Sequence, residues 1–486
     1  MTPLFAKPSI VAEERADGTL VVRSTQPLAD HPHTILASFR SWAEKDPDHV
    51  LATERRADGQ RDALTYGDAA STARAVGEGL IQLGLGPERP LLLLSGNSIA
   101  HLTVLLGALT AGVPVCPISV AYSLQSRDHA RIKEIAELTT PGAVFAEDVD
   151  QFGDALAAVA GVPAIVCRST QPNTIALDQL IATKPGAAVD EAYARLESSS
   201  LAKILFTSGS TGSPKGVLTT HGMLAANQQQ IRQAWPFLET ERPVVVDWLP
   251  WSHTFGGSHN VGLILVSGGT LHIDDGRPAR GLFDQSIQNL VDNPPTIYFN
   301  VPAGFAQLVP VLESDPEFAA RFFSRLRLVF NAAAALPDGL RDRLHDVAER
   351  TTGLPIPVTG SWGLTETAPA VTNAHYDFSD ARTIGVPLPG ADLKLVPVAD
   401  AYEIRVRGPM VTPGYLNRPD LTKTSFDEEG FYLTGDAVQF SDPDDLDLGL
   451  LFRGRLAEDF KLTTGTFVRV GEVDVVGDPL GVVDRA

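Results

Sequence analysis

The segment Thr207-Ser-Gly-Ser-Thr-Gly-Ser-Pro-Lys-Gly216 is the most informative part of this chain, and it follows the apolar run Ile204-Leu-Phe206, which is typical of a buried strand. Glycine lets a backbone approach a phosphate closely, and successive N–H groups can then surround its oxygens. The hydroxyl groups and Lys215 add donors and positive charge. A flexible Ser/Gly linker has no need of Pro-Lys-Gly directly ahead of a strand. The segment therefore predicts a loop that binds phosphate.

The order of residues excludes one common kind of phosphate loop. The P-loop of many NTPases needs Gly directly before its Lys and Ser or Thr directly after it. Pro214 and Gly216 stand at those two positions. We therefore expect a different nucleotide-binding architecture.

The segments around this loop alternate between strand-like and helix-like patterns. Residues 90–95 read as a buried strand, residues 98–110 as a helix, and another strand begins at Gly112. An earlier helix carries apolar residues at helical spacing, and Asp68 is in place to cap it. Strand, helix and strand in this order indicate a parallel sheet covered by helices. The same pattern recurs at 142–145, 164–167, 204–206, 243–247, 296–299 and 326–330.

The pattern changes near residue 384 to short alternating strands, such as Asp392-Leu-Lys-Leu-Val and Glu403-Ile-Arg-Val-Arg. This favours a small β-rich subdomain over about 384–453. The chain has 486 residues, enough for about three folding units. The fold class predicted is α/β, with a large unit over 1–453.

Composition and charge exclude several functions. The chain has 39 basic and 59 acidic residues, a net charge of −20. Such a surface repels the phosphates of nucleic acid and anionic lipid, so we expect neither partner. No run approaches the roughly 18 apolar residues that span a bilayer, and no signal peptide is evident, which favours a cytoplasmic protein. Cys116 and Cys167 lie in apolar runs and are expected to be buried free thiols.

Five further segments combine polar, aromatic and small residues in unusual ways. They are Trp248-Leu-Pro-Trp-Ser-His253-Thr-Phe-Gly-Gly257, Phe330-Asn-Ala-Ala-Ala-Ala-Leu-Pro337, Gly360-Ser-Trp-Gly-Leu-Thr-Glu-Thr367, Phe431-Tyr-Leu-Thr-Gly-Asp436 and Phe452-Arg-Gly-Arg455-Leu-Ala-Glu-Asp-Phe-Lys461. Each also has a plain structural interpretation. Four alanines are common in cores, Gly-Asp is common in turns, His253 can pack between aromatics, and Glu366 can cap a helix.

Taken together and in this order, the segments closely resemble the motifs of the adenylate-forming enzymes, which include acyl-CoA synthetases, luciferases and peptide-synthetase adenylation domains. The amino-acid sequence around His253 and Lys461 resembles that of feruloyl-CoA synthetases in particular. The resemblance covers most of the chain. It implies a large N-terminal domain of stacked α/β subdomains, the β-rich subdomain, and a hinge that leads into a small C-terminal domain.

The resemblance also implies roles for individual residues. Trp362 would stack on adenine, Asp436 would accept both ribose hydroxyls, and Glu366 would bind Mg²⁺ beside the phosphates. The implied ATP-binding residues are Thr207, Ser208, Gly209, Ser210, Thr211, Gly212, Lys215, Ala333, Ala334, Trp362, Thr365, Asp436 and Arg455. The implied acid-binding residues are His253, Phe255, Gly256, His259, Gly360 and Ser361. The implied catalytic residues are Lys215, His253, Thr365 and Glu366, and Lys461 relates to CoA.

The implied reaction has two steps. The carboxylate of an aromatic acid such as ferulate attacks the α-phosphorus of ATP, which gives acyl-AMP and pyrophosphate, and the CoA thiolate then displaces AMP. ATP, Mg²⁺ and CoA are the expected cofactor and co-substrates, and the oligomeric state stays open. Two alternatives remain. An amino-acid adenylation module would place an Asp near His253, and none lies within 251–259. A nucleotide-binding relative without catalysis is the other.

The end of the sequence carries a further expectation. Family members continue past the hinge into a small mobile domain with a lysine that stabilises the adenylation transition state. Here 25 residues follow Lys461, and none is lysine. Residues 454–486 are therefore expected to form only the hinge and a remnant of that domain, and adenylation and thioester formation are expected to be slow.

Overall fold

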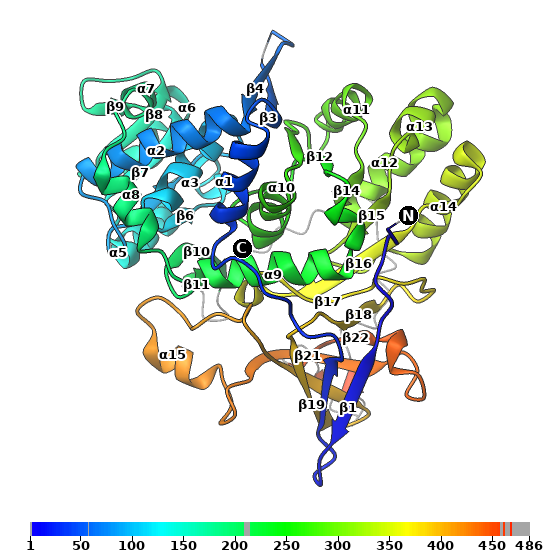
Figure 1. Cartoon of the computed structure of the whole chain (residues 1–486). Coiled ribbons are helices and arrows are strands. Elements are labelled where there is room, and N and C mark those ends of the chain that lie inside the picture. The colour runs from blue at the N-terminus through cyan, green and yellow to red at the C-terminus, as the bar shows by residue number, and fades with distance from the viewer. Residues whose placement is uncertain (1, 57, 209–213, 457–459, 462–466, 469–486) are drawn as a thin grey trace.

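The computed structural model describes residues 2–56, 58–208, 214–456, 460–461 and 467–468. Two sheets form the upper part of the molecule as drawn in Figure 1. The seven-stranded sheet has the order β11-β10-β6-β5-β7-β8-β9, and all neighbouring pairs except β10 with β11 are parallel. Its strands are β5 (Leu91–Leu93), β6 (Val115–Pro117), β7 (Ala143–Asp148), β8 (Ala164–Arg168), β9 (Thr174–Ala176), β10 (Leu201–Ser208) and β11 (Pro214–Thr220).

The second upper sheet has four strands in the order β12-β13-β3-β4. They are β3 (Val50–Arg55), β4 (Arg61–Thr65), β12 (Val244–Asp247) and β13 (Thr270–Ile273). The longer helices of the first half are α1 (Ile35–Lys45), α2 (Tyr66–Gln82), α3 (Ile99–Thr110), α5 (Ala130–Thr139), α6 (Val149–Ala157), α8 (Ala187–Ala194) and α9 (His221–Ala234). Those of the second half are α10 (Val261–Ser267), α11 (Phe283–Asp292), α12 (Pro302–Ser314), α13 (Pro316–Phe323) and α14 (Asp338–Thr352). Helices cover the parallel strands, as the sequence predicts.

The lower part in Figure 1 is rich in strands and belongs to an eleven-stranded sheet that reaches up into the large domain. The order is β1-β2-β19-β20-β21-β22-β18-β17-β16-β15-β14. Its lower strands are β1 (Ile10–Glu14), β2 (Leu20–Ser24), β18 (Thr383–Pro387), β19 (Asp392–Val398), β20 (Ala401–Arg407), β21 (Tyr432–Phe440) and β22 (Leu450–Arg455). Its upper strands are β14 (Ile297–Asn300), β15 (Leu328–Asn331), β16 (Val358–Gly363) and β17 (Ala370–Asn373).

The sheet continues without a break across residue 384, where the sequence predicts a subdomain boundary. The N-terminal hairpin β1–β2 also joins it, because β2 pairs antiparallel with β19, from Arg23 opposite Asp392 to Leu20 opposite Leu395. The strand-rich character of 384–453 is confirmed, and the domain limits themselves stay a prediction. The short strands β23 (Phe460–Lys461) and β24 (Phe467–Val468) form a separate hairpin. The expected remnant of a C-terminal domain otherwise lies outside the described residues.

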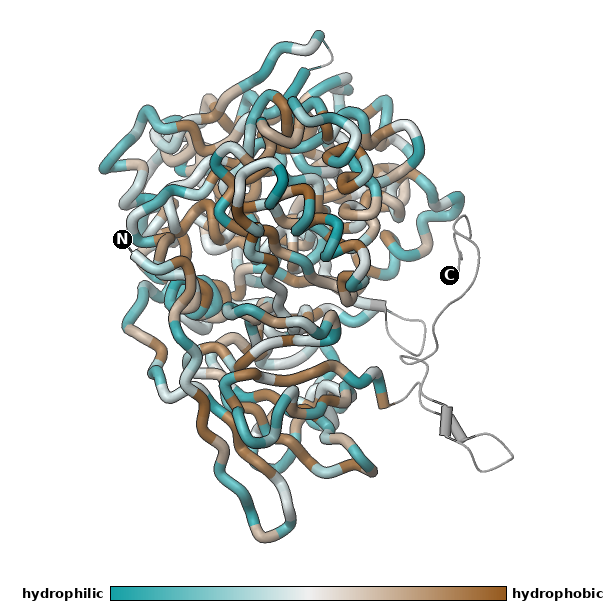
Figure 2. The backbone as a smooth tube through the Cα atoms, turned by 90° about the vertical axis from the view of Figure 1, so that its right-hand side faces the viewer, coloured by the Kyte–Doolittle hydropathy of each residue, from teal (hydrophilic) through white to brown (hydrophobic). Residues whose placement is uncertain are grey.

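Apolar segments lie mainly inside the molecule, as Figure 2 shows along the backbone. The largest core cluster joins α1, α2 and α3 to the strands of both upper sheets. Cys116 is buried and both cysteines are free thiols, but Cys167 is partly exposed, contrary to the prediction. Its strand β8 lies near the edge of the sheet, where it is covered less completely. Among the described residues, no helix is long and apolar enough to cross a membrane.

One predicted helix cap is wrong. The sequence places Asp68 at the start of the second helix, but α2 begins at Tyr66, and the Thr65 side chain accepts from the Asp68 N–H. Asp68 lies instead in the first turn, where a negative charge interacts favourably with the helix dipole. The next predicted helix, over 98–110, is confirmed as α3 (Ile99–Thr110), with Ser98 as its N-cap.

Candidate active site

A cavity of about 490 Å³ opens where β15 and β16 meet β21 and β22. It is lined by residues 331–336, 358–364, 381–384 and 452–455, together with Arg341, Phe378 and Asp436. Seven of the predicted site residues lie here together: Ala333, Ala334, Gly360, Ser361, Trp362, Asp436 and Arg455. The lining includes four arginines but only one acidic residue, which favours an anionic ligand.

Asp436 is the polar centre of this cavity. Its side chain is 2% exposed, its Oδ2 accepts from Trp362 Nε1 at 3.0 Å, and its Oδ1 lies 3.2 Å from Arg455 Nε. The pairing of β21 with β22 puts Asp436 opposite Arg455 in register. A carboxylate has about four lone-pair sites, so Asp436 keeps acceptor capacity for ligand hydroxyls. Trp362, fixed by this hydrogen bond, offers its ring as a flat wall.

The turn after β15 forms another wall. Asn331 Nδ2 donates to the Ala334 carbonyl at 2.8 Å and closes the turn. Ala333 has a φ of 74°, in the left-handed region that non-glycine residues rarely adopt. Small side chains at 332–335 leave the backbone accessible from the cavity, as expected of a surface for a flat ring.

The third wall of the cavity is not predicted from the sequence. Phe378 and Ala381 of one loop line the cavity, and Arg341 of α14 lines it beside them. The Arg341 guanidinium donates to the carbonyls of Phe378 and Ser379 and lies 5.5 Å from the Phe378 ring centroid. The loop has no glycine-rich or otherwise distinctive pattern, so no local signal indicates its role.

Glu366 lies in the short 3₁₀ helix η3 (Thr365–Thr367) next to the cavity wall, 9% exposed. Its Oε1 accepts from the Tyr415 hydroxyl at 2.9 Å. Among the described residues, no cluster of three His, Cys, Asp or Glu side chains forms a complete metal site. A single carboxylate nevertheless fits Mg²⁺, which usually takes one or two protein carboxylates and completes its shell with water and phosphate oxygens.

The predicted phosphate loop joins β10 to β11. Thr207 pairs with Lys215 in this antiparallel hairpin, so both flank the loop at its base. The predicted ligands Gly209, Ser210, Thr211 and Gly212 lie outside the described residues, as do the side chains of Ser208 and Lys461. Thr207, Lys215, Thr365 and Glu366 are not among the residues that line the cavity.

The predicted acid-binding segment forms a π-helix, η2 (Phe255–Asn260). Its glycines are required, because a Cβ on Gly256 would lie 2.4 Å from the Leu249 carbonyl oxygen and one on Gly257 2.1 Å from that of Trp251. Two buried side chains satisfy carbonyls of this turn. Lys203 donates to Gly257, and Gln228 donates to Ser258 and His259 at 3.2 and 3.1 Å. Burial lowers the pKa of Lys203 to about 7.

His259 lies at the centre of an aromatic cluster. Its ring centroid is 5.2 to 6.4 Å from those of Phe330, Phe299, Phe255 and Trp235. Asn260 Nδ2 donates to Asp247 Oδ2, so Asn260 Oδ1 faces His259 Nδ1, each contact being 2.9 Å. The His259 proton therefore sits on Nδ1, which leaves Nε2 as an acceptor. Burial lowers the pKa of His259 to about 4 and raises that of Asp247 to about 7.

The predicted acid-binding residues do not all meet. His253 is exposed, and Phe255, Gly256 and His259 do not line the 490 Å³ cavity, whereas Gly360 and Ser361 do. His253 still lies deep enough for partial desolvation to lower its pKa. The aromatic cluster adjoins the cavity through Phe330, whose neighbour Asn331 lines it. His253 precedes the π-helix and is exposed, whereas His259 lies within it and is buried.

The comparisons with known proteins agree with this fold. The model of the AMP-binding enzyme family matches residues 39–416. The chain therefore belongs to the AMP-binding enzymes, which form the adenylate-forming superfamily, as the sequence predicts.

Several relatives are acid–CoA ligases by name. The long-chain-fatty-acid–CoA ligase of Yersinia pestis is 26% identical over 416 residues, 77% of this chain and 70% of that protein. The malonate–CoA ligase of Arabidopsis thaliana is 29% identical over 253 residues, 49% of this chain but only 40% of that protein. A solved malonyl-CoA ligase with methylmalonyl-CoA and AMP bound is 27% identical, with a TM-score of 0.65 over 85% of this chain and 79% of that one.

Proposed function

We propose that this protein is an AMP-forming acid–thiol ligase that joins a carboxylic acid to CoA through an acyl-AMP intermediate. The observation that carries the proposal is the cavity in which Trp362, Asp436 and Arg455 are held together beside the alanine turn. A flat wall, an acidic diol acceptor and several arginines suit the ring, ribose and phosphates of ATP. The acid–CoA ligases among its relatives support the same reaction class.

In the proposed first step, the acid carboxylate attacks the α-phosphorus of ATP, and the bond to pyrophosphate breaks. Such chemistry depends on positioning and charge stabilisation more than on a protein nucleophile. Lys215, at the base of the phosphate loop, would stabilise the departing pyrophosphate. Mg²⁺, when bound by Glu366, would neutralise phosphate charge. In the second step the CoA thiolate attacks the acyl carbonyl carbon, and AMP leaves.

We propose an aromatic acid of the hydroxycinnamate type as the substrate. Phe255 is the partly exposed member of the aromatic cluster around His259 and would offer its ring to a planar substrate. The His259 acceptor nitrogen suits a ring hydroxyl, which an alkyl chain lacks. The relatives named for long-chain fatty acids and for malonate make those acids the direct competitors.

The test is ATP–pyrophosphate exchange by the full chain with ferulate, p-coumarate, caffeate, palmitate and malonate, followed by detection of each CoA ester. We expect exchange with the hydroxycinnamates at the lowest acid concentrations. A clear preference for palmitate or malonate would contradict the aromatic substrate and leave the ligase reaction intact. ATP binding without exchange for any acid would favour the nucleotide-binding relative without catalysis.

A further inference from the structure

Tyr415 lies between Glu366 and strand β11, which carries Lys215. It lies in the connection between β20 and the short helix α15 (Pro419–Thr424), and it is 6% exposed. Its hydroxyl lies 2.9 Å from Glu366 Oε1 and 2.9 Å from the hydroxyl of Tyr432, which is 7% exposed at the start of β21.

The direction of these hydrogen bonds follows from the chemistry of the groups. Both phenols are buried, and each neutral phenol has a single O–H to donate. Glu366 Oε1 accepts the single proton of Tyr415. The Tyr432 hydroxyl must therefore donate to the Tyr415 oxygen. The result is a chain of donors, Tyr432 to Tyr415 to Glu366, in which each hydroxyl strengthens the next.

The backbone around Tyr415 is bound to the strand that leaves the phosphate loop. Leu416 N donates to the Gly216 carbonyl at 2.8 Å, and Leu218 N donates to the Gly414 carbonyl at 3.1 Å, so Val217 faces Tyr415 in a β-bridge. Gly414 has a φ of 140°, and a Cβ there would lie 2.4 Å from the Thr422 side chain. Only glycine allows the backbone to pass this close to Thr422, and this geometry sets the position of the next residue, Tyr415.

Thr412 connects the backbone of Glu366 to strand β11. Its N–H donates to the Glu366 carbonyl at 2.7 Å, and its hydroxyl donates to the Leu218 carbonyl at 2.7 Å. Residues 412–416 thus hold the backbone of Glu366, its carboxylate and strand β11 in one rigid arrangement. Lys215 precedes Gly216 on that same strand.

We propose that Tyr415 is a positioning residue that orients the Glu366 carboxylate beside strand β11, which carries Lys215, so that a divalent cation and the ATP phosphates are bound together. A neutral phenol suits this task better than lysine or arginine, because it fixes a carboxylate oxygen without supplying a positive charge that competes with the cation. Tyr432 supports Tyr415 through the donor chain. This inference rests on the proposed function, since it takes Glu366 as the metal-binding carboxylate.

The test measures nucleotide binding by calorimetry on the full chain, without acid or CoA. The affinity for ATP is compared in excess Mg²⁺ and in EDTA, and AMP serves as a ligand without β- and γ-phosphates. For Tyr415→Phe we expect the Mg²⁺-dependent gain in ATP affinity to fall about tenfold, as for loss of a hydrogen bond to a charged group. The affinities for ATP in EDTA and for AMP are expected to stay unchanged.

Two further variants make the result decisive. Tyr66→Phe removes another buried hydroxyl, which donates to the carbonyls of Ile264 and Gly269 far from Glu366, and should leave the Mg²⁺ gain unchanged. Tyr432→Phe keeps the Tyr415 hydroxyl and should lower the gain only about two- to threefold. It also carries the test if Tyr415→Phe does not fold.

The outcomes separate this inference from the proposed function. A normal Mg²⁺ gain in Tyr415→Phe and Tyr432→Phe would overturn the positioning role alone. Equal weakening of ATP and AMP in Tyr415→Phe would also overturn it, since the effect would then be general. Failure of the unmodified protein to bind ATP at all would overturn the proposed function, and the positioning role with it.

Discussion

At the scale of single residues, Asp436 shows how one carboxylate is prepared for a ligand. It is nearly inaccessible, yet Trp362 and Arg455 each occupy only one of its oxygens. Buried charge is costly unless it is paired and hydrogen-bonded, and both partners supply that compensation. The same contacts fix the indole ring. A change at Asp436 should therefore affect the flat wall as well as the diol acceptor.

We expect Asp436→Ala to weaken ATP and AMP binding about 10- to 100-fold, because hydrogen bonds to a charged group contribute about 1.5–3 kcal/mol each. Binding of the carboxylic acid alone should be unchanged. Calorimetric titration with each ligand checks this. Asp444→Asn, at an exposed turn, is the matched control. Unchanged AMP affinity in Asp436→Ala would contradict the ribose role.

Lys215 is expected to act on the reaction more than on binding. Its charge at the base of the phosphate loop matters most when pyrophosphate leaves. Lys215→Ala should slow single-turnover acyl-AMP formation about 10²–10³-fold and change the Kd for ATP much less. Rapid-quench measurement beside calorimetry separates the two effects. A loss in Kd as large as the loss in rate would show that Lys215 contributes only ground-state binding.

At the scale of elements, the π-helix η2 depends on glycines that let it pack against the chain before it. Gly257→Ala would force a Cβ into the Trp251 carbonyl. We expect a loss of about 1–3 kcal/mol in the free energy of unfolding, as for other overpacked sites, together with weaker acid binding. Gly339→Ala is the control, since nothing lies within 4 Å of its Cβ position in α14, and it should be neutral or stabilising. Denaturant unfolding of both variants checks this.

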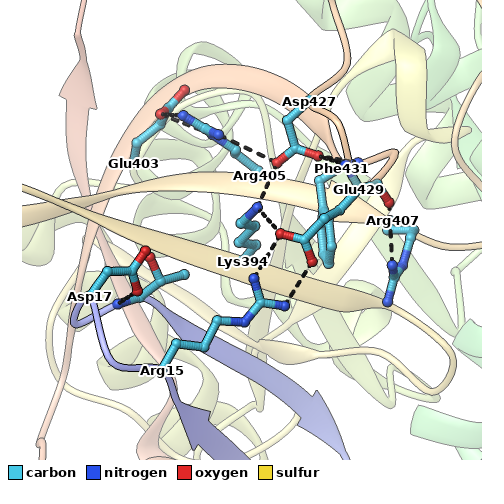
Figure 3. Close-up of polar contacts among 10 residues, drawn as sticks. Arg15, Asp17, Lys394, Glu403, Arg405, Arg407, Asp427, Glu429 and Phe431 are labelled. Atoms are coloured by element: carbon cyan, nitrogen blue, oxygen red, sulfur yellow. Dashed lines mark hydrogen bonds and ion pairs between the residues drawn. The ribbon is translucent and has the colours of Figure 1, made fainter.

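The strand β21 that carries Asp436 is anchored by an ion-pair network, which Figure 3 shows around Phe431. Lys394 of β19 is 9% exposed, and its Nζ lies 2.9 Å from Asp427 and 2.5 Å from Glu429. Arg15 of the N-terminal hairpin binds both oxygens of Glu429, at 2.7 and 2.8 Å. These cations hold the pKa of Glu429 down to about 2 and lower that of Asp427.

The pH dependence follows from these lowered pKa values. A carboxyl group with a lowered folded-state pKa stabilises the fold above its unfolded pKa, near 4, and loses that contribution as the pH falls toward 2. Lys394→Met should therefore lower the Tm most near pH 7, and the difference from the unmodified protein should shrink below about pH 4. Calorimetric scans across this range test it. Lys184→Met, at an exposed position, should show no such trend. A pH-independent difference would mean that packing, not charge, explains the effect.

At the scale of the whole molecule, the N-terminal hairpin joins strands from the second half of the chain in one sheet, since β2 pairs with β19 and buries Val22 in the core of the β-rich part. Val22→Asp would put a charge there without a partner, at a cost of about 3–5 kcal/mol. We expect a lower Tm and proteolytic cleavage near the hairpin. Val11→Asp, on the same hairpin but 44% exposed, should have little effect. Equal effects of the two variants would show that the hairpin is held mainly by backbone pairing.

The sequence by itself determined the elements and motifs whose causes are local. Apolar strands such as β10 and β12 and the helix predicted over 98–110 depend on neighbours within about ten residues, which hydrophobic periodicity reveals. The family was also evident from the order of these motifs, and the comparison over 39–416 confirmed it. The choice of Asp68 over Thr65 as a cap was wrong, because both residues satisfy the same local pattern and only backbone geometry separates them.

Tertiary structure alone decided which distant residues meet. Trp362 binds Asp436 across 74 positions, and Tyr415 binds Glu366 across 49. No periodicity reports such pairs, because they depend on how β16, β21 and the 412–416 segment pack together. The same packing brings the Phe378 loop and Arg341 to the cavity and leaves His253 exposed while it buries His259. Burial then sets the charge states, since the pKa values of His259 and Asp247 follow from desolvation, a property of the folded chain.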